Sequence, residues 1–208
     1  MQFFDYKPAP SPRRVRVFMA EKGIELPTVQ IDLANGGQYD ETFRAINPRC
    51  TVPVLQLDDG TCLTETLAIC SYLEACYPAP PLLGRDARER ALVLQWNSRI
   101  EVEGLLSIAE SFRNHSRGFR DRALTGPQPY AQLPELVERG RRRAESFFDM
   151  LDVHLAQSPY VVGSHFSMAD ITAMISVDFA GWIKLPIGER SHLARWHRSV
   201  AARPSATA

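Results

Sequence analysis

The pattern of apolar and polar residues changes near Pro78. Before it, short apolar runs bounded by Gly, Pro and Asp alternate with segments of helical periodicity. Strands are predicted over 1–5, 27–33, 52–57 and 61–64, helices over 12–22 and 65–77, and a short helix or irregular turn over 39–46. The last two strands flank Asp58-Asp59-Gly60 and predict a hairpin. The order βαβαββα favours a small mixed sheet covered by helices.

Beyond the proline-rich stretch 78–81, helical periodicity replaces the strands. Helices are predicted over 86–112, 133–157 and 189–200, and a core helix starts at Ser167. There Ser167-Met168-Ala169-Asp170 forms a capping box, which accounts for Asp170 without a catalytic role. We therefore expect an α/β domain at 1–78, a linker at 79–84 and an all-α helical bundle at 85–208.

Composition and charge narrow the function classes. The chain is 45% hydrophobic and 23% charged, typical of a globular protein, which excludes disordered and fibrous classes. Lys+Arg and Asp+Glu are both 24, a balance that argues against a nucleic-acid or membrane-surface binder. Residues 139–143 hold the densest arginine cluster, interpreted as a solvated helix face.

Motifs for export, metal binding and dithiol chemistry are missing from the sequence. No apolar run predicts a transmembrane helix and no signal peptide is recognised, so a cytoplasmic protein is expected. The four cysteines show no C-x-x-C spacing, and the five histidines show no metal-binding spacing. We expect reduced thiols, no metal and no prosthetic group.

Four segments in order resemble the glutathione S-transferase superfamily over nearly the whole chain. They are Ser11-Pro12-Arg13-Arg14-Val15-Arg16, Asn47-Pro48-Arg49-Cys50-Thr51-Val52-Pro53-Val54-Leu55, Leu63-Thr64-Glu65-Thr66-Leu67-Ala68-Ile69, and Ser167-Met168-Ala169-Asp170. The resemblance implies a thioredoxin-like N-terminal domain, a helical C-terminal domain, glutathione as co-substrate and a homodimer.

Ser11 is the candidate catalytic residue. Because Pro12 suits the first helical position, Ser11 is predicted as the N-cap of the first helix. A hydroxyl beside a helix N-terminus stabilises a thiolate by hydrogen bonding and positive potential. The resemblance places a thiol-activating Ser, Tyr or Cys here. A plain capping role for Ser11, and Tyr6 as the activating hydroxyl, are the alternatives.

Two further motifs are the candidate glutathione-binding groups. The resemblance implies a cis Val52–Pro53 bond that lets the Val52 backbone pair with the cysteinyl backbone of glutathione. It also implies that Glu65 and Thr66 take the γ-glutamyl ammonium and carboxylate, the latter at a helix start. Arg49 and Thr51 are candidates for the glycyl carboxylate. Cys50 replaces a glycine common in relatives, and is either a buried spectator or an exposed thiol.

The resemblance also implies a small hydrophobic electrophile as second substrate, in a cleft between the domains. The candidate lining residues are Pro10, Leu106, Phe112, His115 and Phe119, while Trp182 is either lining or core. The sequence thus predicts a cytoplasmic, detoxification-type glutathione transferase that acts on neither nucleic acid nor membrane. A non-catalytic interaction protein of the same fold and a glutathione-dependent isomerase are the alternatives.

Overall fold

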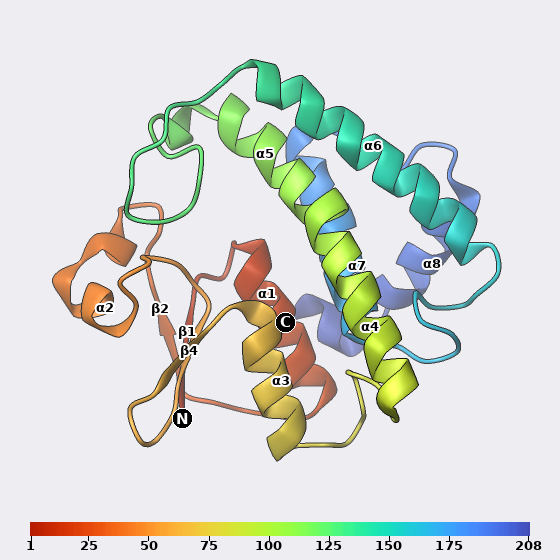
Figure 1. The fold of residues 1–208 in the computed structure, drawn as a ribbon, viewed down its shortest axis with the longest axis horizontal. Helices are drawn as coiled ribbons and strands as arrows, with labels where there is room; N and C mark the ends of the chain where they lie inside the picture. Colours follow the sequence, from red (N-terminus) through yellow and green to blue (C-terminus); the bar gives the residue numbers. More distant parts are fainter. The chain divides into compact units, whose positions relative to one another are not determined.

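The computed structural model describes all residues from 1 to 208, in two compact units. Unit 1 contains Met1–Pro80, Leu124–Pro129 and Ala208, and unit 2 contains Pro81–Ala123 and Tyr130–Thr207. Unit 1 is a mixed α/β fold and unit 2 is all-helical, as drawn in Figure 1. The expected fold class is therefore confirmed.

Unit 1 has the predicted order of strands and helices. Its elements are β1 Gln2–Asp5, α1 Pro10–Glu21, β2 Thr28–Gln30, the 3-10 turn η1 Gly37–Tyr39, α2 Glu41–Ile46, β3 Val54–Gln56, β4 Cys62–Thr64 and α3 Thr66–Cys76. The strand order is β2-β1-β3-β4, with β1 and β2 parallel and the other neighbours antiparallel. The pairing of β3 with β4 confirms the predicted hairpin.

The sheet of unit 1 is covered on both faces because its strands are apolar on both. Successive residues of a strand point to opposite faces. Phe4 and Val54 pack with Phe43 of α2, with the Phe4 and Phe43 ring centroids 6.0 Å apart. Phe3 and its cross-strand partner Leu55 are fully buried on the other face, where α1 and α3 lie (Figure 1).

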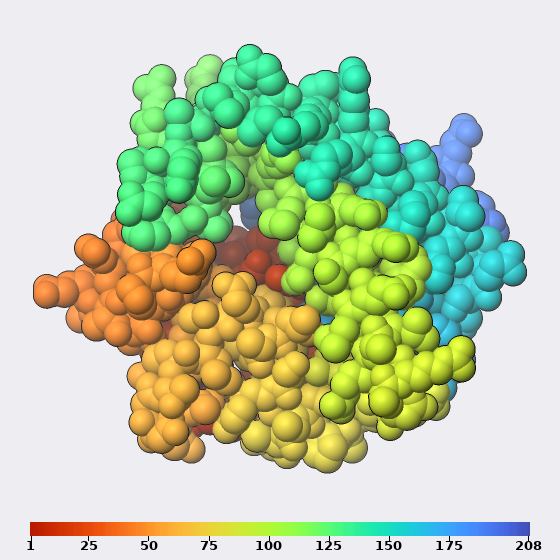
Figure 2. Space-filling model, in the orientation of Figure 1, coloured from red at the N-terminus to blue at the C-terminus, as the bar shows by residue number.

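One segment that is distant in sequence belongs to unit 1. Residues 124–129 follow the first helices of unit 2, yet they pack on the α2 side of unit 1. The Tyr39 hydroxyl donates a hydrogen bond to the Gly126 carbonyl oxygen at 3.4 Å. Figure 2 shows this green segment against the orange surface of the β2–α2 region. No sequence pattern predicted this contact.

Unit 2 is a bundle around α7, whose side chains are almost all buried. Its elements are α4 Ala87–Arg99, the π-helical segment η2 Ile100–Leu105, α5 Leu106–His115, the 3-10 turn η3 Arg117–Phe119, α6 Glu135–Leu155, α7 Met168–Ala180, the 3-10 turn η4 Gly181–Ile183, α8 Ser191–Ala201 and the 3-10 turn η5 Pro204–Thr207. The single helix predicted over 86–112 thus contains a π-helical segment, so that expectation was incomplete.

Glycines allow the long helices of unit 2 to approach closely. A Cβ atom at Gly104, inside η2, would lie 2.6 Å from Cε1 of Phe147 on α6. A Cβ atom at Gly140 of α6 would lie 2.6 Å from the Ser107 carbonyl oxygen on α5. Real Cβ atoms do not approach that closely, so only glycine permits this packing at either position.

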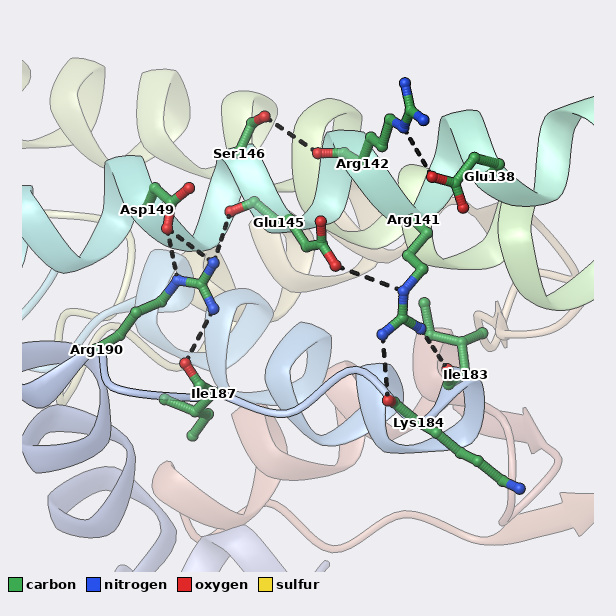
Figure 3. A network of polar contacts seen from close by, with 10 residues as sticks. All are labelled: Glu138, Arg141, Arg142, Glu145, Ser146, Asp149, Ile183, Lys184, Ile187 and Arg190. Carbon is green, nitrogen blue, oxygen red and sulfur yellow. Dashed lines mark hydrogen bonds and ion pairs between the residues drawn. The ribbon is translucent and has the colours of Figure 1, made fainter.

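The arginine cluster of α6 is bonded to other elements and is not merely a solvated face. Arg139 and Arg143 both bind the Glu110 carboxylate of α5, at 2.6 and 3.1 Å. Arg141 donates to the Ile183 carbonyl oxygen at 2.9 Å and so ties η4 to α6 (Figure 3). Arg142 is the one member whose side chain pairs only within α6, in an ion pair with Glu138. The side chains of Arg139 and Arg142 remain 61% and 76% exposed, so the interpretation as a solvated face was incomplete because it left out these bonds.

Candidate active site

The first turn of α1 presents Ser11 with both of its donors available. The helix begins at Pro10 with Ala9 as its N-cap, so the prediction of Ser11 as N-cap was wrong. Pro10 and Pro12 have no N–H, and the Arg13 amide already donates to the Ala9 carbonyl oxygen at 3.3 Å. The Ser11 amide is therefore the one N–H of this turn that makes no hydrogen bond within the helix. The Ser11 hydroxyl is half-buried and does not cap the helix.

Tyr6 lies just before this turn. Its carbonyl oxygen accepts a hydrogen bond from the Ala9 amide at 2.9 Å, which closes the turn between β1 and α1. Its side chain is half-buried. Tyr6 and Ser11 thus belong to the same short connection, and the structure leaves both hydroxyls as candidates for contact with a thiol.

Asn47 shapes the loop that contains Val52 and Pro53. Its buried side-chain amide donates to the Thr51 carbonyl oxygen at 2.8 Å and to the Thr51 hydroxyl at 3.1 Å. The Arg49 amide donates back to the Asn47 side-chain oxygen at 3.1 Å. The Val52–Pro53 bond is cis, as the resemblance implied. Sequence analysis quoted Asn47 in a motif but missed its organising role.

The backbone of Val52 lies outside the strand ladder, which begins at Val54. Thr51 and Val52 are half-buried, whereas Arg49 is exposed. Cys50 is buried and takes a left-handed φ of 55°, with its Sγ atom 3.6 Å from the Pro48 carbonyl oxygen. Its burial matches the spectator interpretation of this thiol rather than the exposed one.

The β4–α3 junction presents a carboxylate and a helix N-terminus side by side. Glu65 is the N-cap of α3, is exposed, and has a φ of 68°. A positive φ in a residue with a Cβ atom costs conformational energy and is commonest at functional sites. Thr66, the first residue of α3, is buried. The exposed Glu65 carboxylate therefore lies next to the first amides of α3, which make no hydrogen bond within the helix.

The Thr66 hydroxyl joins α3 to α1. It donates to the Ser11 carbonyl oxygen at 3.3 Å and accepts from Nη2 of Arg14 at 3.1 Å. Arg14 is 5% exposed. Sequence analysis quoted Arg14 within a motif but assigned it no role. Ser11 and Thr66, forecast as separate site residues, are thus directly connected.

Aromatic side chains gather in unit 2 at the end of α5. The Phe112 ring lies 5.2 Å from Phe119, 5.6 Å from Phe179 and 5.1 Å from Trp182, each in an edge-to-face arrangement. Trp182 remains 51% exposed. Rings in this geometry attract one another beyond the area that they bury. We call Phe112, Phe119, Phe179 and Trp182 the aromatic cluster.

The other residues predicted to line the electrophile site, Leu106, His115 and Pro10, lie outside the aromatic cluster. Leu106 is 56% exposed at the start of α5, and His115 is exposed at its end. Pro10 is half-buried in unit 1. The Arg113 guanidinium lies 4.5 Å from the Phe119 ring centroid and donates to the Ala123 carbonyl oxygen. Arg113 therefore holds the connection after α5 in place.

Asp170 serves the fold, as predicted. Both halves of the Ser167–Asp170 capping box are present, and the fully buried carboxylate also accepts from the Val161 amide and the Trp196 indole, each at 2.9 Å. Burial raises the pKa of this carboxyl to about 6, although these hydrogen bonds act in the opposite direction. A group this enclosed has a structural role.

No group of three or more His, Cys, Asp or Glu side chains is placed to hold a metal ion. None of the helices combines the length with the hydrophobicity that a membrane span requires.

Comparison with known proteins gives the family. Residues 9–76 match the glutathione S-transferase N-terminal domain, and residues 134–174 match the C-terminal domain. The chain is 35% identical to glutathione S-transferase 2 of Saccharomyces cerevisiae, over 99% of this chain and 87% of that protein.

Solved structures agree with this match. A glutathione S-transferase domain-containing protein of Marinobacter aquaeolei VT8 superposes with a TM-score of 0.90 and 35% identity, covering 99% of both chains. Gtt2 of Saccharomyces cerevisiae superposes with a TM-score of 0.90 and 35% identity, covering 99% of this chain and 98% of that one. The chain therefore belongs to the glutathione S-transferase family.

Proposed function

We propose that this protein is a glutathione transferase that binds reduced glutathione on unit 1 and ionises its thiol at the first turn of α1. The observation that carries the proposal is the donor arrangement at Ser11. Two prolines remove the neighbouring amides, so a thiolate at this helix end meets the Ser11 N–H and O–H. Both donors and the helix N-terminus favour the anion.

The backbone of glutathione is proposed to bind across unit 1. The Val52 amide and carbonyl pair with its cysteinyl residue, next to the cis Pro53. The exposed Glu65 carboxylate takes the γ-glutamyl ammonium. Because the Thr66 hydroxyl proton is committed to Ser11, the Thr66 amide is the donor for the γ-glutamyl carboxylate. Arg49 and Thr51 contact the glycyl carboxylate.

The aromatic cluster of unit 2 is proposed to bind the electrophile, together with Leu106 and His115 at the two ends of α5. In the reaction, the thiolate sulfur attacks an electrophilic carbon. A carbon–sulfur bond forms, the bond to a leaving group such as chloride breaks, and the thiol proton passes to solvent. Positioning and thiolate formation supply most of the catalysis. We further propose a cytoplasmic homodimer with a role in detoxification.

The proposal is tested by conjugating glutathione to a chlorinated nitrobenzene with wild type and Ser11→Ala. We expect kcat/KM to fall ~10- to 1000-fold, the range for loss of one donor to a developing or bound anion. Unchanged activity contradicts the role of Ser11. Absence of wild-type activity, together with no glutathione binding by calorimetry, contradicts the enzyme function and favours a non-catalytic interaction protein.

A further inference from the structure

Arg14 is a buried charged residue in unit 1 that the proposed reaction does not use. It follows Ser11 by three positions on α1, so the two residues share a helix face. Its side chain is 95% buried, and Nη2 donates to the Thr66 hydroxyl at 3.1 Å. A guanidinium keeps its charge at every pH relevant to proteins and has no acceptor, so this hydrogen bond has a fixed direction.

The direction of that bond determines where the Thr66 hydroxyl points. A hydroxyl has one proton and two acceptor lone pairs. With Arg14 donating to a lone pair, the proton is directed to the Ser11 carbonyl oxygen, 3.3 Å away. Donors aligned head to tail polarise one another, which strengthens each bond in the series. Arg14, Thr66 and Ser11 therefore form one directed series of hydrogen bonds.

The series ends on the residue that is proposed to meet the thiol. Fixing the Ser11 carbonyl oxygen fixes the first turn of α1, and with it the Ser11 amide and hydroxyl. Capping does not fix this turn, because its N-cap is Ala9 and makes no side-chain hydrogen bond. The hydrogen bond from α3 supplies a constraint that the cap does not.

We propose that Arg14 is a positioning residue for thiol ionisation: acting through the Thr66 hydroxyl, it holds Ser11 where its donors stabilise the glutathione thiolate. The inference rests on the proposed function, because it needs glutathione bound at Ser11. It adds that the thiol pKa depends on a residue that does not itself contact the sulfur.

The test measures the pKa of the glutathione thiol bound to the protein at saturating glutathione, from the ultraviolet absorbance of the thiolate against pH. Arg14→Gln removes the charge, Thr66→Val removes the hydroxyl, and Thr66→Ser retains it. We expect Arg14→Gln and Thr66→Val each to raise the thiol pKa by ~1 unit and Thr66→Ser to leave it near the wild-type value. The double variant Arg14→Gln/Thr66→Val should exceed neither single variant appreciably, because both break one series.

A pH profile separates positioning from general damage to the fold. If the thiol pKa rises by ~1 unit, kcat falls up to ~10-fold at pH values below it and recovers at alkaline pH, where the thiol is ionised in every variant. A loss of equal size at all pH values contradicts the proposal. So does an unchanged thiol pKa in folded Arg14→Gln and Thr66→Val.

The outcomes also distinguish this inference from the proposed function. If wild type binds no glutathione, the proposed function fails. If Ser11→Ala raises the thiol pKa while Arg14→Gln and Thr66→Val do not, only the role of Arg14 fails. If Arg14→Gln does not fold, the thiol pKa of Thr66→Val compared with that of Thr66→Ser decides. These two variants differ in the hydroxyl that completes the series of hydrogen bonds.

Discussion

The hydroxyl of Thr66 donates a hydrogen bond to the carbonyl oxygen of Ser11 at 3.3 Å, and this bond connects the first turns of α3 and α1. Both turns expose unused amides, so two positive helix ends lie within one small region of unit 1. Glutathione carries an anionic carboxylate and an ionisable thiol. The region therefore suits a ligand that brings two negative groups, here the thiolate and the γ-glutamyl carboxylate.

Glu65 combines a binding role with a strained backbone, and the two effects can be separated. Glu65→Ala and Glu65→Gly both delete the carboxylate, so both should raise KM for glutathione ~10-fold or more, as expected for a lost charged hydrogen bond. Glycine tolerates the φ of 68° that alanine does not. Glu65→Gly should therefore be more stable than Glu65→Ala by about 1 kcal/mol in denaturant unfolding.

The two variants act as controls for each other. Equal stability would show that the backbone at residue 65 is not strained. An unchanged KM for glutathione in both would remove Glu65 from the binding site, whatever the stability result.

Asp170 should make unit 2 sensitive to pH. Asp170→Ala leaves the Val161 amide and Trp196 indole buried without their acceptor, which should cost about 3 kcal/mol in the free energy of unfolding at pH 7. Because burial raises the pKa of Asp170 from 3.8 to about 6, the folded state binds more protons than the unfolded state between these values. The stabilising contribution of Asp170 therefore grows as pH falls.

The measurement compares wild type with Asp170→Ala by denaturant unfolding at pH 7 and pH 5. The difference in stability should be larger at pH 5 by about 1 kcal/mol. Other titrating groups are common to both proteins and cancel. A difference that shrinks on acidification would mean that the buried carboxyl has a lowered pKa instead.

Trp182 tests the aromatic cluster as the surface for the electrophile. Trp182→Ala should raise KM for an aromatic electrophile ~5-fold, which corresponds to the loss of about 1 kcal/mol of ring contact. KM for glutathione should not change. Tyr130→Ala is the matched control, because Tyr130 is a similarly exposed aromatic residue of unit 2 outside the cluster. Equal effects of the two variants, or none for Trp182, would contradict the assignment.

Local patterns in the sequence were sufficient for most of the secondary structure. The hairpin around Gly60 and the capping box at Ser167 were predicted because their residues act on near neighbours. The start of α1 was misplaced because Pro10 and Pro12 both suit the first helical position. The helix begins at Pro10, because Ala9 has an extended backbone and its carbonyl oxygen accepts a hydrogen bond from the Arg13 amide.

Features that depend on contacts distant in sequence were not predicted. The π-helical segment Ile100–Leu105 lies inside the single helix predicted over 86–112, and no sequence pattern indicated it. The hydrogen bond of Arg14 is to Thr66, more than fifty positions away. The candidate site residues came largely from the family resemblance, whereas the hydrogen bonds that connect them came from the structure.

The most direct test of the account is the pKa of the glutathione thiol when bound to the wild-type protein. A free thiol has a pKa of about 8.5, and stabilisation at the first turn of α1 should lower it to about 6.5. Titration of the thiolate absorbance in the complex would then show mostly thiolate at neutral pH, with a higher pKa in Ser11→Ala. A bound thiol that still titrates near the value for a free thiol would contradict the account.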